Sequence, residues 1–566
     1  TGCRNTASGY ATLYDNTTGH SNVANGDLAL RNNEVGDYNT AIGICSIFTA
    51  ASACCNTAIG AFSLQNTTTG EKNAVVGARA MLTNTTGLKN TVIGDTAMYY
   101  NTSGTGNTAS GYRALLCNTT GGCNTASGYR SLHANTTASQ NAALGACAMN
   151  LNTTGDKNAA VGYSALVQNT TASCNVAMGD HAMNKNTTGH SNIAIGRQAM
   201  GCNTTASYNT VVGACAFYCN TTGGDAVVAM GFKAMHNNTT GKCNTALGFC
   251  SMHGITEGCF NTASGYRSAA GTTTGSYNVA YGANSLLSNT TGLSNNAVGY
   301  ATMYSNTTGQ LNTAIGDGAL YNNTTAHCNV AVGRIALYAN TTGALNVAVG
   351  TDALKDNTTG TCNVGLGYLA LDDVTTGSKN IGLGRAAGGN LTTGSCNVVI
   401  GTDAETSAAD AVNQIVIGFG GAGAGDNQTV IGNSSTTNTT IHGTVSAPDA
   451  TFGAVMENNL ASPNVATEPE GTILIWEGGI AKPSYVEYDS RVLGIVKENS
   501  DKPIVLGAEP VLMTGVISEG DFIVTSDKKG HGKKGVSNNL FGKVIAQALE
   551  DGEGDSYTIK AMIRKI

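Results

Sequence analysis

The chain has 566 residues, a net charge of −7 and 11% charged residues, with 75 glycines, 6 prolines and one tryptophan. This is not the composition of an ordinary globular domain, and the 41% hydrophobic residues argue against a disordered chain. The weak negative charge gives no indication of a nucleic-acid partner, which would need a basic stripe. No run of about 18 apolar residues is present, so we expect no membrane span.

The first 403 residues repeat one phrase, which reads Asn-Thr-Ala-Ile-Gly at residues 56–60. Its starting points are spaced by 17 residues from Asn5 to Asn209, by 18 residues to Val227, and by 17 again to Asn397, which gives 24 units. A fixed period of this kind predicts a solenoid, because one short coil cannot bury its apolar side chains without neighbours above and below. We therefore expect an all-β fold in which about 24 coils stack as a β-solenoid (β-roll).

Two columns of the repeat carry the expected structural roles when the Asn is numbered 0. Position +4 is Gly in every unit, which indicates a positive φ or a close backbone approach. Stacking places identical residues about 4.8 Å apart, so the Asn column should form a hydrogen-bonded ladder. Representative residues of the two columns are Asn56, Gly60, Asn73, Gly77, Asn90, Gly94, Asn124, Gly128, Asn312 and Gly316.

The apolar filling is expected at positions +3 and +8. Position +3 is mostly aliphatic, as in Ile42 and Val76, and +8 is mostly Leu or Met, as in Leu64. Positions +2 and +7 are small, and we expect them to allow a close approach of three chains. Position +11 is Asn in 17 of 24 units, within a turn-forming Asn-Thr-Thr-Gly cluster. Each coil should therefore contain two short extended pieces and two tight corners.

Position +5 varies most and is expected on the outside. It carries Tyr112, Tyr129 and Tyr266, and these tyrosines follow a Ser at +3. A ring that covers the space left by the smaller core residue is the favoured interpretation, and glycan binding is the alternative. These three tyrosines and Trp476 are the candidate surface contacts.

The 17 cysteines fall on four columns, at −2, −1, +6 and +10. We favour small buried residues made in a reducing cytoplasm. A Cys117–Cys123 disulfide across one corner is an alternative. There is no Cys-x-x-Cys motif, and the nine histidines show no ligand spacing, so we expect no metal and no cofactor.

Beyond the repeats the pattern changes three times. Residues 404–446 read as degenerate capping coils and a fibrous segment, 447–470 as a linker, and 471–566 as a compact C-terminal β domain with alternating strands. The chain begins in the frame of the repeat, from which we expect a further N-terminal part.

No nucleophile, metalloprotease or phosphate-loop motif is present, so we do not expect an enzyme. The recurrent Asn-Thr-Thr sequons are interpreted as structural, since glycans would crowd at this spacing.

The Asn-Thr-Ala-Ile-Gly coils resemble the head repeats of trimeric autotransporter adhesins, which build a trimeric β-roll. The 17-residue form, with Ala-Leu and Asn-Thr-Thr-Gly, is similar to tail and capsid fibre proteins of bacteriophages. Residues 488–496, 520–526 and 542–550 are similar to β domains near the ends of such fibres. The resemblance implies a homotrimeric fibre on a virion surface, whose partners are other virion proteins and a host receptor or glycan.

These observations favour a structural fibre that extends a receptor-binding tip toward a host surface. A bacterial surface adhesin or extracellular filament subunit is the nearest alternative. An ice-binding solenoid is another, although the Thr residues then lie in corners rather than within strands. A glycan depolymerase in the C-terminal domain is the least favoured.

Overall fold

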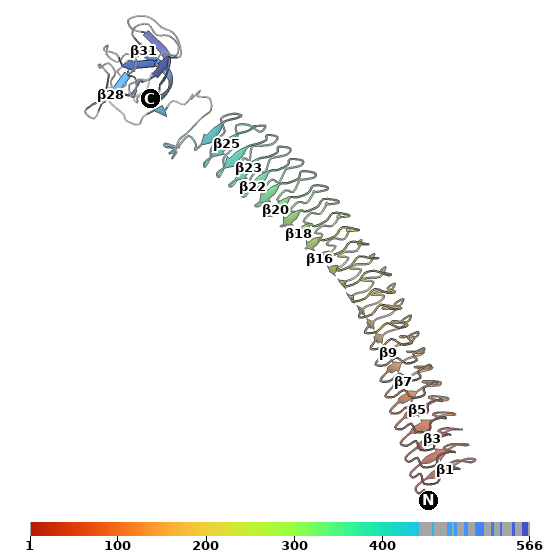
Figure 1. Ribbon diagram of the computed structural model, residues 1–566. Coiled ribbons are helices and arrows are strands. Elements are labelled where there is room, and N and C mark those ends of the chain that lie inside the picture. The colour runs from red at the N-terminus through yellow and green to blue at the C-terminus, as the bar shows by residue number, and fades with distance from the viewer. Residues whose placement is uncertain are drawn as a thin grey trace. The chain divides into compact units, whose positions relative to one another are not determined.

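The computed structural model describes residues 2–440 and, by backbone alone, the strands between residues 456 and 563. The chain divides into two units, 1–439 and 440–566. The first is a parallel β-solenoid of about 25 coils without a helix, as the period predicts (Figure 1). Successive strands pair in parallel and in register, so that Thr57 lies beside Ala74, and Ala58 beside Val75.

Each coil contributes one strand of three residues. The strands of the solenoid are β1 (Thr6–Ser8), β2 (Val23–Asn25), β3 (Thr40–Ile42), β4 (Thr57–Ile59), β5 (Ala74–Val76), β6 (Thr91–Ile93), β7 (Thr108–Ser110), β8 (Thr125–Ser127), β9 (Ala142–Leu144), β10 (Ala159–Val161), β11 (Val176–Met178), β12 (Ile193–Ile195), β13 (Thr210–Val212), β14 (Val228–Met230), β15 (Thr245–Leu247), β16 (Thr262–Ser264), β17 (Val279–Tyr281), β18 (Asn296–Val298), β19 (Thr313–Ile315), β20 (Val330–Val332), β21 (Val347–Val349), β22 (Val364–Leu366), β23 (Ile381–Leu383), β24 (Val398–Ile400), β25 (Ile415–Ile417) and β26 (Thr429–Ile431). The last two continue the sheet as shortened coils, as expected for the degenerate repeats.

The second unit contains strands of antiparallel and mixed pairing, of which only the backbone is described. They are β27 (Met456–Glu457), β28 (Ile473–Glu477), β29 (Ile480–Pro483), β30 (Val492–Ile495), β31 (Ile504–Met513), β32 (Phe522–Thr525), β33 (Gly532–Lys534), β34 (Ala546–Ala548) and β35 (Tyr557–Ile563). The predicted linker lies outside the described residues apart from β27. Trp476 belongs to β28, and its side chain also lies outside the described part.

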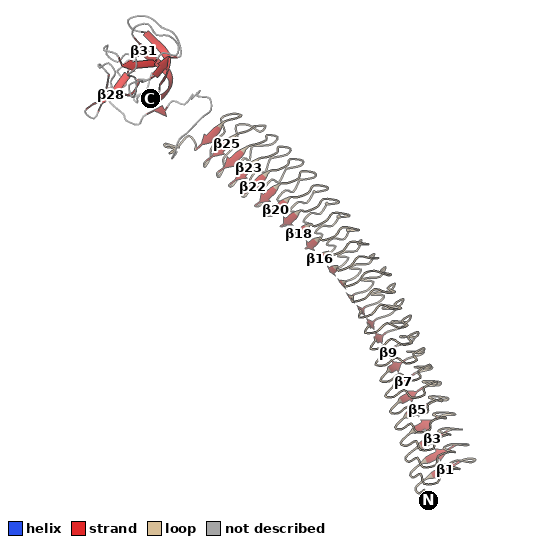
Figure 2. Ribbon diagram, viewed as in Figure 1, coloured by secondary structure: helices blue, strands red, loops and turns tan. Residues whose placement is uncertain are grey.

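The prediction of a second extended piece in each coil is wrong. Positions +5 to +10 form a continuous turn, and Figure 2 shows strands on only one side of the stack. Within the turn, residues with a positive φ alternate with residues that have a negative φ. Phe62 at +6 and Leu64 at +8 have φ of 59° and 51°. Non-glycine residues with positive φ persist only where their surroundings over-determine them. Here hydrogen bonds to the adjacent coils do so, as between the Leu64 amide and the Ala80 carbonyl at 2.9 Å.

The asparagine ladder is confirmed, and it lies at the centre of the coil. The Asn73 Nδ2 donates to the Gly87 carbonyl of its own coil and to the Asn56 Oδ1 of the previous coil, each at 3.0 Å. The Asn73 Oδ1 in turn accepts the Asn90 backbone amide at 3.0 Å. The Asn column at +11 forms a second ladder that converges on the same carbonyl, since Asn84 also donates to Gly87. Both columns are buried, which excludes N-glycosylation of these sequons in the folded coil.

The predicted core is only partly correct. Position +8 is buried, but the aliphatic residues at +3 are exposed, including Ile42, Val76, Leu144 and Met178. The small residues at +2 and +7, such as Ala58 and Ser63, fill the interior beside +8. Because side chains alternate along a strand, a buried Asn at 0 and Ala at +2 require +1 and +3 to point outward. The small columns are therefore interior packing and not a surface where three chains approach.

Position +4 requires glycine for the predicted reasons. Gly60 has a φ of 135°, and a methyl group there would lie 2.5 Å from the carbonyl oxygen of Gly77 in the next coil. The same contact recurs along the stack, since Gly77 and Gly94 are related in the same way.

We expect Gly60→Ala to lower the free energy of unfolding by about 2–4 kcal/mol, because it combines backbone strain with a steric clash. Chemical denaturation of the full chain measures this change. Gly389→Ala is the control, since a methyl group there meets no atom closer than 3.4 Å. Equal effects of the two substitutions would contradict the assigned role of position +4.

We expect Asn73→Ala to cost about 2 kcal/mol or more, because the buried Asn90 amide loses its acceptor and the Gly87 carbonyl keeps only the Asn84 donor. The half-buried Asn66 at +10 is the control, because its side chain belongs to neither ladder, and Asn66→Ala should change stability by less than about 1 kcal/mol. A loss at Asn73 no larger than that at Asn66 would show that the ladder is not a main source of stability.

Candidate functional site

The outward side chains of the solenoid strands form one continuous surface, which we call the strand face. It consists of positions +1 and +3 of β1–β26. No Asp, Glu, Lys or Arg occurs at either position in these 26 strands. Position +3 is aliphatic in most coils and is well exposed, at 39% for Ile59 and 43% for Met230.

Charged residues lie directly beside the strand face but not on it. Position +5, just past the Gly corner, carries Asp27, Arg197 and Arg334, and position −1, just before the Asn, carries Lys72 and Lys157. Some of these charges pair between adjacent coils, as Arg197 does with Asp180 at 3.8 Å. Charge is therefore excluded from one surface of the rod rather than from the whole rod.

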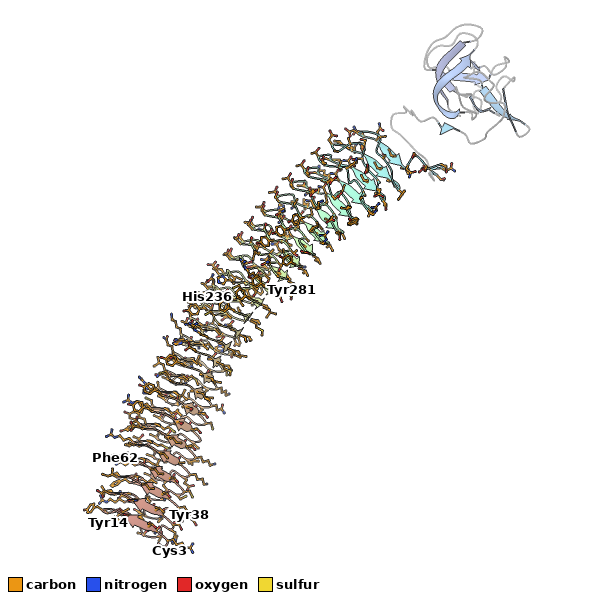
Figure 3. All side chains as sticks on the ribbon, turned by 180° about the vertical axis from the view of Figure 1, so that it is seen from behind. Cys3, Tyr14, Tyr38, Phe62, His236 and Tyr281 are labelled. Atoms are coloured by element: carbon orange, nitrogen blue, oxygen red, sulfur yellow. The ribbon has the colours of Figure 1, made fainter. Side chains whose placement is uncertain are left out.

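The remaining surfaces are different in character. Figure 3 places Tyr281 of the strand face and His236 of the turn on opposite sides of the rod. The turn side carries aromatic stacks at position +9, such as Tyr304, Tyr321 and Tyr338, whose ring centroids are 4.9 and 5.1 Å apart. Because these rings stack on one another, the ring faces between adjacent coils are covered.

The strand face is large for a surface that is exposed to solvent. Twenty-six strands at about 4.8 Å spacing extend about 125 Å, and three residues span about 10 Å. This gives a footprint of about 1,250 Å², in which aliphatic side chains predominate but Thr, Ser and Asn also occur. The largest apolar patch of a typical monomer is about 300–600 Å². A stable protein–protein interface buries about 800 Å² on each partner. The strand face has the area and the chemistry of an interface.

The candidate tyrosines are exposed, as predicted, but not for the predicted reason. Tyr112 and Tyr129 stack on each other at 5.6 Å along the rod axis, and Tyr266 stacks on Phe249 at 5.5 Å. The accompanying serines at +3, such as Ser110, belong to the strand face and leave no space in the core. The packing partner of each ring is thus the ring of the next coil.

The interpretation of the cysteines as buried residues is wrong for most of them. All are free thiols, and only Cys45 is buried. Those at −1 are mostly exposed, including Cys123, and Cys117 does not pair with it.

Among residues 2–440, no three His, Cys, Asp or Glu side chains gather closely enough to hold a metal ion. The described part contains no helix long and apolar enough to cross a bilayer.

Comparison with known proteins returns no match, either to a family model or to a curated protein. Sequence reasoning identified the ladder residues and the exposed column at +5, but it missed the strand face. The strand face could have been found from the alternation of side chains within Asn-Thr-Ala-Ile. Because the Asn at position 0 must point into the coil, the side chains at +1 and +3 must point outward.

The half-buried Cys54 and the exposed Cys123 should differ in reactivity. Burial and a hydrogen bond to Glu71 raise the pKa of the Cys54 thiol to about 12. A raised pKa lowers the thiolate fraction at pH 8, so we expect alkylation of Cys54 by iodoacetamide to be about a hundredfold or more slower than that of Cys123. Peptide mapping measures both rates, and the difference should vanish in denaturant. Equal rates in the native protein would contradict this placement of Cys54.

Proposed function

We propose that the chain is the rod of a homotrimeric structural fibre on a virion surface, which extends its C-terminal domain toward a host receptor or glycan. The single observation that carries this proposal is the uncharged strand face along the whole solenoid. Such a face is most simply covered by further copies of the same chain, because each copy presents an uncharged, mostly aliphatic ribbon of the same length.

Self-association is favoured over other partners by symmetry and area. Most soluble oligomers are built from identical copies, and an interface of about 1,250 Å² per chain exceeds what a stable complex needs. Large aliphatic side chains at +3, such as Ile59 and Ile315, can interdigitate between facing sheets, as in sheet packing generally. The number three comes from the resemblance to trimeric adhesin heads and phage fibres.

A rod of stacked coils is suited to reach rather than to catalysis. Each coil contacts only its neighbours, so length is gained by repetition, and adhesion is gained when many fibres act together.

The alternatives remain a bacterial adhesin or filament subunit, and ice binding. For ice binding, the strand face is flat and uncharged, and it carries Thr at +1 in several strands. However, Val23, Ala74 and Asn296 interrupt that column, and position +3 is mostly aliphatic, so no regular Thr rank is formed.

The mass of the full chain in solution, by light scattering, tests this proposal. We expect three chains of 57.3 kDa per particle. Lysine substitutions at Ile59, Val76 and Ile315 should reduce the particle to one chain, because buried unpaired charges are costly. The matched control places Lys at Thr69, Thr86 and Thr325, which are exposed at +13 in the same three coils.

Circular dichroism should show that both triple variants keep their coils. A wild-type particle of one chain, or a strand-face variant that still contains three, would contradict the proposal. A continuous range of sizes would favour the filament. Thermal hysteresis in the same sample would favour ice binding.

A further inference from the structure

The turn of the coil has two alternative hydrogen-bond directions within this one chain. In regular coils the amide at +8 donates forward to the next coil, as from Leu64 to Ala80 at 2.9 Å. In three coils it donates backward, from Phe217 to Ala199 at 2.9 Å and from Met235 to Ala216 at 2.7 Å, and likewise from Met252. The peptide plane between +7 and +8 is therefore reversed there.

The reversed segment covers four successive coils. Position +8 has a positive φ from Leu13 to Met183 and again from Ala269 to Gly388, but not at Met200, Phe217, Met235 or Met252. Both backbone directions thus occur in coils of nearly the same sequence. The two states therefore differ little in energy for a single coil, and the neighbouring coils select one of them.

Hydrogen bonding is mismatched at both boundaries of this segment. At the first boundary the Met183 amide faces forward and the Met200 amide faces backward, and neither donates to a carbonyl among the described backbone hydrogen bonds. At the second, the Ser251 and Ser268 carbonyls face each other, and neither accepts within that same set. Any reversed segment must have two such boundaries. At one boundary two backbone amides face each other, and at the other boundary two backbone carbonyls face each other.

Both asparagine ladders are interrupted in the same segment. Val227 replaces the Asn at position 0, so it offers no side-chain acceptor to the Asn244 amide. The coil before it has 18 residues, and its Asn209 donates to Asn192 but to no carbonyl at +14, again among the described hydrogen bonds. At +11, Asn238 Oδ1 and Thr272 Oγ1 are buried without a partner, and the ladder resumes only at Asn289 and Asn306. Gaps at +11 also leave the side-chain oxygens of Asn33 and Asn357 unpaired, but within residues 5–397 only this segment has a gap at position 0 as well.

Aromatic stacks are concentrated on the outside of these coils. Phe232, Phe249 and Tyr266 stack at 5.4 and 5.5 Å. His236 stacks between Tyr218 and His253 at 5.5 and 5.4 Å, and Phe260 stacks on Tyr277 at 5.2 Å. Each stacked pair contributes about 0.5–1.5 kcal/mol, so the rings offset only part of what the interrupted ladders lose.

We propose that residues 199–289, which we call the seam, open first, and that they divide the solenoid into two separately cooperative blocks. In a solenoid each coil contacts only its neighbours, so a weak set of interfaces separates units that open independently. This inference does not depend on the number of chains in the fibre.

Native-state trypsin digestion of the full chain tests the seam, because cleavage sites occur at the same column inside and outside it. Position +6 carries Lys233 and Arg267 within the seam, and Arg79, Arg113 and Arg130 in regular coils. We expect cleavage after Lys233 and Arg267 to be about tenfold or more faster, since proteolysis follows local opening. Mass spectrometry of the first fragments identifies the sites. Equal rates at all five positions would overturn the proposal.

A repaired variant provides the matched control. Val227→Asn, Ile255→Asn and Thr272→Asn, together with deletion of Gly223, restore both ladders and the 17-residue spacing. We expect its cleavage after Lys233 to fall to the rate at Arg79, and an unchanged rate would overturn the proposal. If the variant does not fold, hydrogen exchange of the wild-type chain decides. The proposal then requires faster amide exchange in 199–289 than in 56–157, and uniform protection would refute it.

Discussion

The side-chain hydrogen bonds of the buried asparagine at position 0 determine the rest of the coil. Each such Asn closes its own coil by donating to the carbonyl at +14, and joins the next coil by accepting its backbone amide. Both bonds require the Asn to point inward at a fixed depth. Because an unpaired buried amide group is costly, this arrangement fixes where the chain turns and how the coils superimpose. Position +4 must then be Gly, since the next coil approaches too closely for a Cβ atom.

The strand face follows from this constraint. The interior is narrow, and the inward positions 0, +2, +7 and +8 fill it with Asn, small residues and one Leu or Met. No space remains for a second aliphatic column, so the residues at +3 lie outside. A monomer in water has no physical reason to keep this column mostly aliphatic and free of charge over 26 strands. A rod that is covered along this side by its own copies does have such a reason.

The extent to which the sequence predicts this structure differs between its parts. The period, the ladders and the glycine corner follow from the columns themselves, because identical residues must superimpose in a stack. The direction of +3 was mispredicted because apolar residues such as Ile42 were assigned to the core without considering the alternation set by the Asn. The turn at +5 to +10 could not be predicted, since left-handed Leu and Met residues have no sequence signature. The reversed peptides at Met235 and Met252 are likewise invisible, because regular coils such as that of Met183 have the same residue types.

Methionine oxidation provides the most direct test of whether the strand face is covered. Met178 and Met230 lie on this face and are 42% and 43% exposed in the single chain, whereas Met81, Met98 and Met149 at +8 are fully buried. Treatment of the native full chain with peroxide, followed by peptide mapping, compares the two groups, since sulfoxide formation follows exposure. If copies cover the face, Met178 and Met230 will be protected nearly as well as the core methionines. Rapid oxidation of these two residues, with the core methionines intact, would show that the face is open to water and would contradict the account.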